Sequence, residues 1–179
     1  MRIPGTPFAE DARGVTFVEF ALIAPVAMLL VAFVGVVGQG MEMAAKTTQV
    51  ARTLGNLVSM QTGGLTSAEL TCMLNAGAAI MSPWDPSTLT VTLSQVHVAG
   101  SAATVAWSRS TGTAARDPGS LILRAGASLP DNTDWIVAEV RYTFTPPFVS
   151  NSLMGPVPLT STTWSPTRGA GAISIIPKS

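Results

Sequence analysis

An apolar run near the N-terminus constrains this chain more than any other feature. Residues 15–37 read VTFVEFALIAPVAMLLVAFVGVV and carry one charged side chain, Glu19. At about 1.5 Å per residue the run makes a helix roughly 35 Å long, and the hydrocarbon core of a bilayer is about 30 Å thick. The run therefore predicts a membrane-spanning helix. The competing interpretations are a buried helix of a soluble protein and a cleaved signal peptide, whose apolar region is only about 7–15 residues long.

Composition favours the membrane interpretation and argues against a nucleic-acid partner. Only 11% of the residues are charged and the net charge is zero, whereas a soluble domain carries about 25% charged residues. Binding to nucleic acid would need a basic patch, which this sequence lacks. Arg2 and Arg13 precede the run and Lys46 and Arg52 follow it, so the positive-inside rule gives little preference. The short head favours a cytoplasmic N-terminus.

Two residues inside the run need an explanation. A charge at the centre of a membrane helix costs at least about 2.5 kcal/mol, so Glu19 needs a partner unless the span begins at Phe20 and leaves the carboxylate at the headgroups. Pro25 removes a helix hydrogen bond and tends to kink the helix. We expect either a harmless kink or a surface shaped for packing against another helix.

The residues around Glu19 follow a recognisable order. Gly14 is followed by four residues, then by Glu19 and Phe20, at the start of the apolar helix. This order resembles the site cut by prepilin peptidases in type IV pilins and their relatives. The string FVEFALIAP at residues 17–25 is similar to the TadE-like pseudopilins, which are minor pilins of the Flp/Tad pilus system. The resemblance covers only about residues 13–40.

The resemblance implies a cleavage site and an assembly contact. The peptidase would cut between Gly14 and Val15 on the cytoplasmic side, which makes residues 1–14 a leader and gives Val15 a new amine. Residues four apart lie on one side of a helix, so Glu19 could pair with that amine in its own chain or in a neighbour. In the family this contact is believed to set the register of subunits during assembly.

The same resemblance implies partners and a location. Phe20 and Pro25 would shape helix packing. The implied partners are the membrane, the prepilin peptidase, other pilins or pseudopilins and the pilus assembly platform. The protein would be a single-pass inner-membrane protein with its C-terminal domain in the periplasm, and incorporation into an extracellular pilus stays open.

Beyond the run, the pattern predicts an α+β fold. We expect a long N-terminal transmembrane and spine helix, a short second helix and a small antiparallel β-sheet domain. The expected divisions are a leader at 1–14, a transmembrane helix at 15–38, its extramembrane continuation at 39–62 and a periplasmic α+β domain at 63–179.

Local patterns refine this layout. Apolar side chains three and four residues apart predict one buried face on a helix that ends near residue 61: Met43, Val50, Leu54 and Leu57, with Thr47 between them. Glu42 and Lys46 stand at the spacing of a helical ion pair. A cap at Thr66 or Ser67 predicts a second helix that ends before Pro83.

Alternating residues predict the strands. They fall at residues 89–98, 102–107, 135–144, 159–164 and 172–176. A change of phase after Leu93 predicts a bulge near Ser94–Gln95. Residues 110–132 and 145–158 are expected to be loops. In the second loop Phe148, Leu153 and Met154 would form an apolar patch, either for a partner or packed onto the sheet.

Catalytic and metal-binding signals are weak. His97 and Cys72 are the only histidine and cysteine, so the usual transition-metal sites are nearly excluded and no cofactor is expected. No nucleophile elbow, phosphate loop or dinucleotide motif is present, although carboxylate pairs stay open. We expect Cys72 to be a small buried hydrophobe, and His97 to face solvent and Gln95. We expect no enzyme. The alternatives to a pilin-like protein are a membrane-anchored extracytoplasmic binding module unrelated to pili and, far less favoured, an anchored hydrolase.

Overall fold

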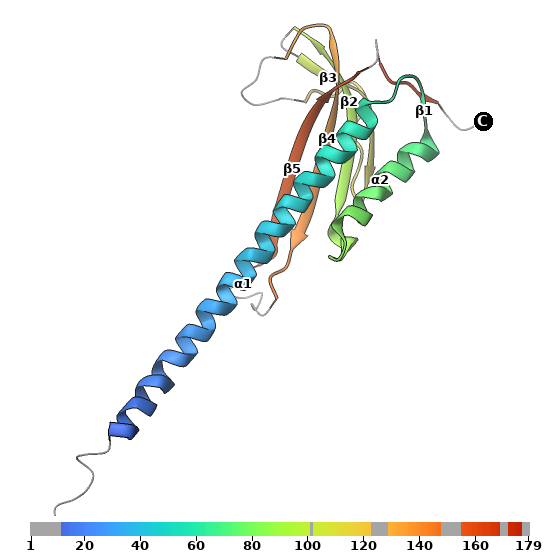
Figure 1. Cartoon of the computed structure of the whole chain (residues 1–179). Coiled ribbons are helices and arrows are strands. Elements are labelled where there is room, and N and C mark those ends of the chain that lie inside the picture. The colour runs from blue at the N-terminus through green and yellow to red at the C-terminus, as the bar shows by residue number, and fades with distance from the viewer. Residues whose placement is uncertain (1–11, 101, 123–128, 148–154, 169–171, 177–179) are drawn as a thin grey trace, which may run out of the picture. The chain divides into compact units, whose positions relative to one another are not determined.

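The structure, a computed structural model, has the predicted α+β fold (Figure 1). It describes residues 12–100, 102–122, 129–147, 155–168 and 172–176. The chain divides into two compact units, residues 1–39 and 40–179. The helix α1 runs without interruption over Ala12–Ser59 with Pro25 inside it, which confirms the single long helix predicted from the sequence.

The part of α1 within the second unit buries one face. Its buried side chains recur three and four residues apart: Met43, Thr47, Val50, Ala51, Leu54 and Val58. The prediction was wrong at Leu57, which is 40% exposed, while Val58 beside it is fully buried. A helix completes one turn in 3.6 residues. A buried stripe built from steps of three and four residues therefore shifts slowly around the helix, and at this end it contains Val58 and not Leu57.

The short helix α2 (Ser67–Met81) begins at the predicted cap. The side chain of Thr66 accepts a hydrogen bond from the backbone N–H of Glu69, and the Glu69 carboxylate accepts from the backbone N–H of Thr66. This reciprocal capping box satisfies two donors that would otherwise lack partners. It fixes the start of α2 immediately after the short strand β1 (Leu65–Thr66).

The turn after α2 is tied to α1. The Lys46 ammonium donates to the backbone carbonyl of Ser82, and the indole N–H of Trp84 lies 3.4 Å from a carboxylate oxygen of Glu42. The predicted contact between Glu42 and Lys46 is therefore replaced by two contacts to a segment about 40 residues away in the sequence.

Four antiparallel strands form the main sheet in the order β3-β2-β4-β5. Their bounds are Thr90–Ala99 for β2, Ala102–Thr111 for β3, Thr133–Phe144 for β4 and Val157–Pro166 for β5. The strands were predicted at these places, although β3, β4 and β5 extend further than expected and β5 includes the residues 157 and 158 that were assigned to a loop. A short 3₁₀ helix, η2 (Pro86–Thr88), precedes β2.

The two helices cover one face of this sheet, which we call the inner face. A Cβ added to Gly77 of α2 would lie 3.3 Å from Val50 of α1 and 3.4 Å from Val91 of β2. A Cβ added to Gly55 of α1 would lie 3.5 Å from Ala138 of β4. Each glycine therefore lets a helix backbone approach its neighbour closely, and the main core lies between the helices and the sheet.

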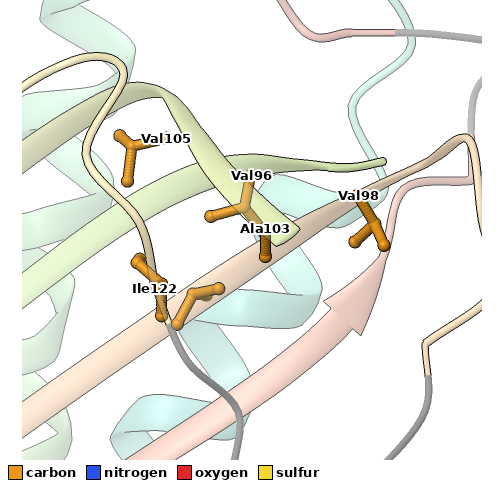
Figure 2. Close-up of a cluster of buried hydrophobic side chains, with 6 residues drawn as sticks. Val96, Val98, Ala103, Val105 and Ile122 are labelled. Carbon is orange, nitrogen blue, oxygen red and sulfur yellow. The ribbon is translucent and has the colours of Figure 1, made fainter. Parts of the chain in front are cut away.

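A second, smaller core covers part of the opposite face, which we call the outer face (Figure 2). Its buried members are Val96, Val98, Ala103, Val105, Ile122 and Val137. The loop after β3 supplies Ile122, whose backbone N–H donates to the carbonyl of Ala103. Val91 and Leu93 of β2 are buried on the inner face, whereas Val96 and Val98 are buried on the outer face. The apolar residues of β2 therefore change from odd to even positions because both faces of the strand are covered.

The predicted bulge is present, but its extra residue belongs to β3. Gln95 pairs with Trp107 and Val96 pairs with Val105, so Ala106 has no opposite residue. The bulge turns Trp107 to the inner face, whereas Val105 lies in the outer core. Strict alternation along the strand predicted at residues 102–107 would have put both side chains on one face, and the bulge separates them.

The last described strand, β6 (Ile175–Ile176), lies outside the main sheet. It pairs in parallel with β1, with Leu65 opposite Ile175. The sequence predicted a strand here but neither β1 nor this partner. The predicted apolar patch of Phe148, Leu153 and Met154 lies outside the described residues.

Candidate functional site

The N-terminal part of α1 is apolar and exposed. Phe17, Leu22 and Leu29 are 74%, 76% and 71% exposed, and no residue in the most apolar window of the helix is buried. Within the described residues this is the one helix long and apolar enough to cross a membrane. By length and composition it suits a membrane anchor or a signal sequence.

The predicted site residues lie in order along this helix. The backbone of Gly14 and Val15 belongs to α1, and the side chains are described from Thr16 onward. Glu19, Phe20 and Pro25 are all exposed. The helix therefore places Glu19 one turn beyond Val15, on the same side.

The carboxylate stands in an otherwise apolar surface. On insertion scales Leu, Ile, Phe and Val contribute about −0.3 to −0.6 kcal/mol each at the helix centre, and a charge there costs at least about 2.5 kcal/mol. About six such residues therefore offset one charge. The run supplies at least ten: Phe17, Val18, Phe20, Leu22, Ile23, Val26, Leu29, Leu30, Val31 and Phe33. A helix of this composition can insert despite Glu19, and a cation beside the carboxylate would lower the cost.

A polar groove on the outer face is the second candidate site. Its volume is about 430 Å³, and its lining includes Thr90, Thr92, Arg116, Glu139, Arg141 and Thr143. Two guanidinium nitrogens of Arg116 donate to the two Glu139 oxygens at 2.8 and 2.6 Å. The hydrogen bond to Glu139 raises the pKa of Arg116. The groove offers hydroxyls and the exposed Arg141 to a polar ligand.

The only histidine has a carboxylate partner. His97 Nδ1 lies 3.0 Å from Asp134 Oδ1, and the His97 side chain is 44% exposed. Nearby, the backbone N–H groups of Gly100 and Asn132 donate to Asp131 and hold the pKa of that carboxyl below its usual value, with a smaller contribution from His97. In the described residues, no group of three or more His, Cys, Asp and Glu could hold a metal.

Two predictions about single residues were wrong. Gln95 is fully buried and does not accompany His97 at the surface, because it occupies the inner face next to Trp107. Cys72 is exposed on α2, since the buried stripe of that helix is Leu70, Leu74, Gly77 and Met81. The spacing of that stripe in the sequence already excludes position 72.

Gln95 anchors a contact that the sequence did not reveal. Its side-chain oxygen accepts hydrogen bonds from the Trp107 indole and from the backbone N–H of Ile173. The two partners are 12 and 78 residues away. A lone glutamine in an alternating strand carries no signal of such a role.

Comparison with known proteins assigns the chain to no family. No family model, curated protein or solved structure matches the chain. The architecture itself is pilin-like, since a long apolar N-terminal helix continues into a stretch packed against a small antiparallel sheet.

Proposed function

We propose that this protein is a pilin-like subunit that a prepilin peptidase processes after Gly14, and that it takes part in assembling a Flp/Tad-type pilus at the inner membrane. The observation that carries the proposal is the continuity of α1 over Ala12–Ser59. One helix bears an exposed apolar stretch with a single carboxylate and then a stretch packed under a sheet.

The chemistry of Glu19 supports this proposal. Cleavage before Val15 creates an ammonium group one helical turn from the carboxylate. In a medium of low dielectric constant two opposite charges attract strongly, and an unpaired charge is costly. Pairing with the amine of a neighbouring subunit would hold two helices at a fixed axial offset. Phe20 and Pro25 are exposed on the same helix and would shape the packing around that contact.

The remaining assignments belong to the same proposal. The protein is a single-pass inner-membrane protein with a cytoplasmic N-terminus and a periplasmic C-terminal domain. Its partners are the prepilin peptidase, other pilins or pseudopilins and the assembly platform. We assign it a structural role without catalysis, because the sequence has no nucleophile elbow, phosphate loop or dinucleotide motif.

The N-terminal mass of the protein tests this function directly. We expect protein purified from membranes that contain the native peptidase to begin at Val15. Gly14→Ala should block this maturation, because the resemblance places the glycine directly before the cut. Gly5→Ala, a matched change within the leader, should leave it intact. An unprocessed N-terminus in the wild-type protein would contradict the proposal.

A second measurement separates assembly from insertion. Glu19→Gln keeps the shape of the side chain and removes its charge, so membrane extraction should be unchanged while pilus formation is lost. Glu42→Gln, on the same helix within the second unit, is the control. Normal piliation in the Glu19 variant would exclude the proposed pairing.

The alternative is a membrane-anchored extracytoplasmic binding module, and the groove beside Arg141 favours it. In that case the N-terminus stays intact, Glu19 is incidental and Arg141→Gln abolishes binding of the ligand. The mass measurement therefore distinguishes the two functions.

A further inference from the structure

Two of the charged groups in the polar groove of the outer face are already paired with each other. Arg116 donates two hydrogen bonds to the Glu139 carboxylate, at 2.8 and 2.6 Å. The backbone N–H of Arg116 also donates to Ser108 Oγ at 3.2 Å. These three contacts hold Arg116 by both its side chain and its backbone. The pair therefore forms a fixed wall of the groove that a ligand does not have to order.

Arg141 is the charged group of the groove that is left without a partner. Two guanidinium groups and one carboxylate line the described part of the groove, so one positive charge is not balanced. The Arg141 side chain is exposed, and it makes no hydrogen bond or ion pair with the described residues. A guanidinium presents a planar fork of donors that matches the two oxygens of a carboxylate. The groove is therefore suited to a ligand with one carboxylate.

Free hydroxyl groups surround this guanidinium. Thr90 lies opposite Arg141 in the pairing of β2 with β4, and Thr143 is the next residue on the same face of β4. Thr113, in the loop after β3, also lines the groove. The hydroxyls of these three threonines have no hydrogen-bond partner among the described residues. Each hydroxyl donates one hydrogen bond and accepts two, so a complementary ligand carries hydroxyl groups beside its carboxylate.

The loop after β3 lies close to β2 and forms one side of the groove. Gly112 has a φ of +78°, and a Cβ at this position would lie 3.0 Å from Thr90 Cγ2. Glycine accommodates both this backbone conformation and so close an approach. The volume of the groove, about 430 Å³, is in the lower part of the range of about 300–1,000 Å³ for small-molecule sites. This size favours a ligand as small as one sugar residue.

The lining disfavours other classes of ligand. Its described part contains no aromatic ring on which a nucleobase would stack. A phosphate monoester carries a charge of about −1.5 to −2 at pH 7, which exceeds the one positive charge available here. An apolar ligand would cover the threonine hydroxyls without giving them hydrogen bonds, which is costly.

We propose that this groove binds an acidic sugar of the uronic acid type, with its carboxylate on Arg141 and its hydroxyl groups on the three free threonine hydroxyls. A carboxylate has about four lone-pair sites, so Glu139 keeps acceptors for a sugar hydroxyl after it has bound Arg116. The site goes beyond the proposed pilin-like function. All of its lining residues belong to the second unit, and the binding does not depend on processing of the N-terminus.

Titration of the detergent-solubilised full-length protein with glucuronate at pH 7 tests this site. Glucose, which has a CH₂OH group in place of the carboxylate, is the matched ligand. We expect glucuronate to bind and glucose to bind at least about tenfold more weakly, because the bonds to a charged group are lost. Arg141→Gln should weaken glucuronate binding by a similar factor. Arg52→Gln, at an exposed position of α1, should leave it unchanged.

A second pair of measurements tests the hydroxyl contacts. Thr143→Val keeps the shape of the side chain and removes its hydroxyl, so it should weaken the binding of glucuronate. Acetate, which offers the carboxylate alone, should bind the wild-type protein more weakly than glucuronate does. Acetate binding as tight as that of glucuronate would overturn the assignment to a sugar. Equal binding of glucose would overturn the role of the carboxylate, and absence of glucuronate binding would overturn the site.

The comparison of the three ligands uses the wild-type protein, so it decides the proposal even if a variant does not fold. The N-terminal mass of the same sample keeps this proposal apart from the pilin-like function. A processed chain that does not bind glucuronate contradicts only the sugar site. An unprocessed chain that binds it contradicts only the pilin-like function.

Discussion

The two parts of α1 differ in where their apolar surface finds a partner. Residues 16–37 expose large apolar side chains such as Leu22 and Val31, whereas residues 43–59 bury Val50 and Leu54 against α2 and the sheet. Both parts are regular helix. Backbone conformation therefore does not distinguish them, and the distribution of side chains around the helix does.

The difference shows what each part requires. The second part places its apolar residues on one stripe and its polar residues on the other side, as a helix covering a core does. The first part is apolar all round, which is typical of a helix inside a membrane or a large assembly. Among the described residues, the apolar stripe of the second part is buried and the apolar side chains of the first part are exposed.

The largest effect is expected from charges placed in the first part of α1. Leu29→Arg with Leu30→Arg puts two charges into the exposed apolar stretch at a cost of about 5–7 kcal/mol for insertion, and we expect loss of the protein from the membrane fraction after carbonate extraction. Ala45→Arg with Gln49→Arg adds the same charges to exposed positions of the second part. This control should stay in the membrane, and equal loss of both proteins would contradict the comparison.

Next in size is the removal of a buried side chain from the second part. Leu54 is fully buried, so Leu54→Ala should lower the free energy of unfolding by about 2–5 kcal/mol. Leu57→Ala, three residues away and 40% exposed, should cost much less. Denaturant unfolding of the detergent-solubilised protein measures both, and similar midpoints would refute the buried stripe.

Glycine substitutions give a smaller contrast. A Cβ at Gly77 would already lie 3.3 Å from Val50, whereas a Cβ at Gly35 would have no atom within 4 Å. Gly77→Leu should therefore destabilise the second unit by about 1–3 kcal/mol through overpacking. Gly35→Leu should leave the unfolding midpoint unchanged. A tolerated leucine at position 77 would show that α2 packs elsewhere.

The smallest effect is electrostatic and belongs to the second unit. Hydrogen bonds from Thr66 hold the pKa of Glu69 below its ordinary value of 4.5. The carboxylate therefore stabilises the fold above that value, and this contribution is lost as the pH falls through the lowered pKa. Glu69→Gln should flatten the dependence of the unfolding midpoint on pH below 4.5.

A partial variant sharpens that measurement. Thr66→Ala removes the hydroxyl donor and keeps the backbone donor to Glu69, so it should flatten the same dependence by less. An unchanged pH profile in both variants would mean that the capping box does not form in solution.

Elements with a local signal were predictable from the sequence. The composition of residues 15–37 predicts an apolar helix, and the capping residues predict where α2 begins. Alternation sets the positions of β2 to β5. In each case the information lies within a few residues, because the side-chain periods of helices and strands and the contacts of a helix cap are local properties of the chain. The candidate site at Gly14 and Glu19 was visible for the same reason.

Only the tertiary structure decided the contacts between distant segments. Gln95 is hydrogen-bonded to Ile173, Lys46 is hydrogen-bonded to Ser82, and β1 pairs with β6. Such contacts depend on how the elements pack, so no local pattern encodes them. The bulge at Ala106 follows from the same cause. A side chain is buried by what lies opposite it in space, and its own neighbours in the sequence do not determine that.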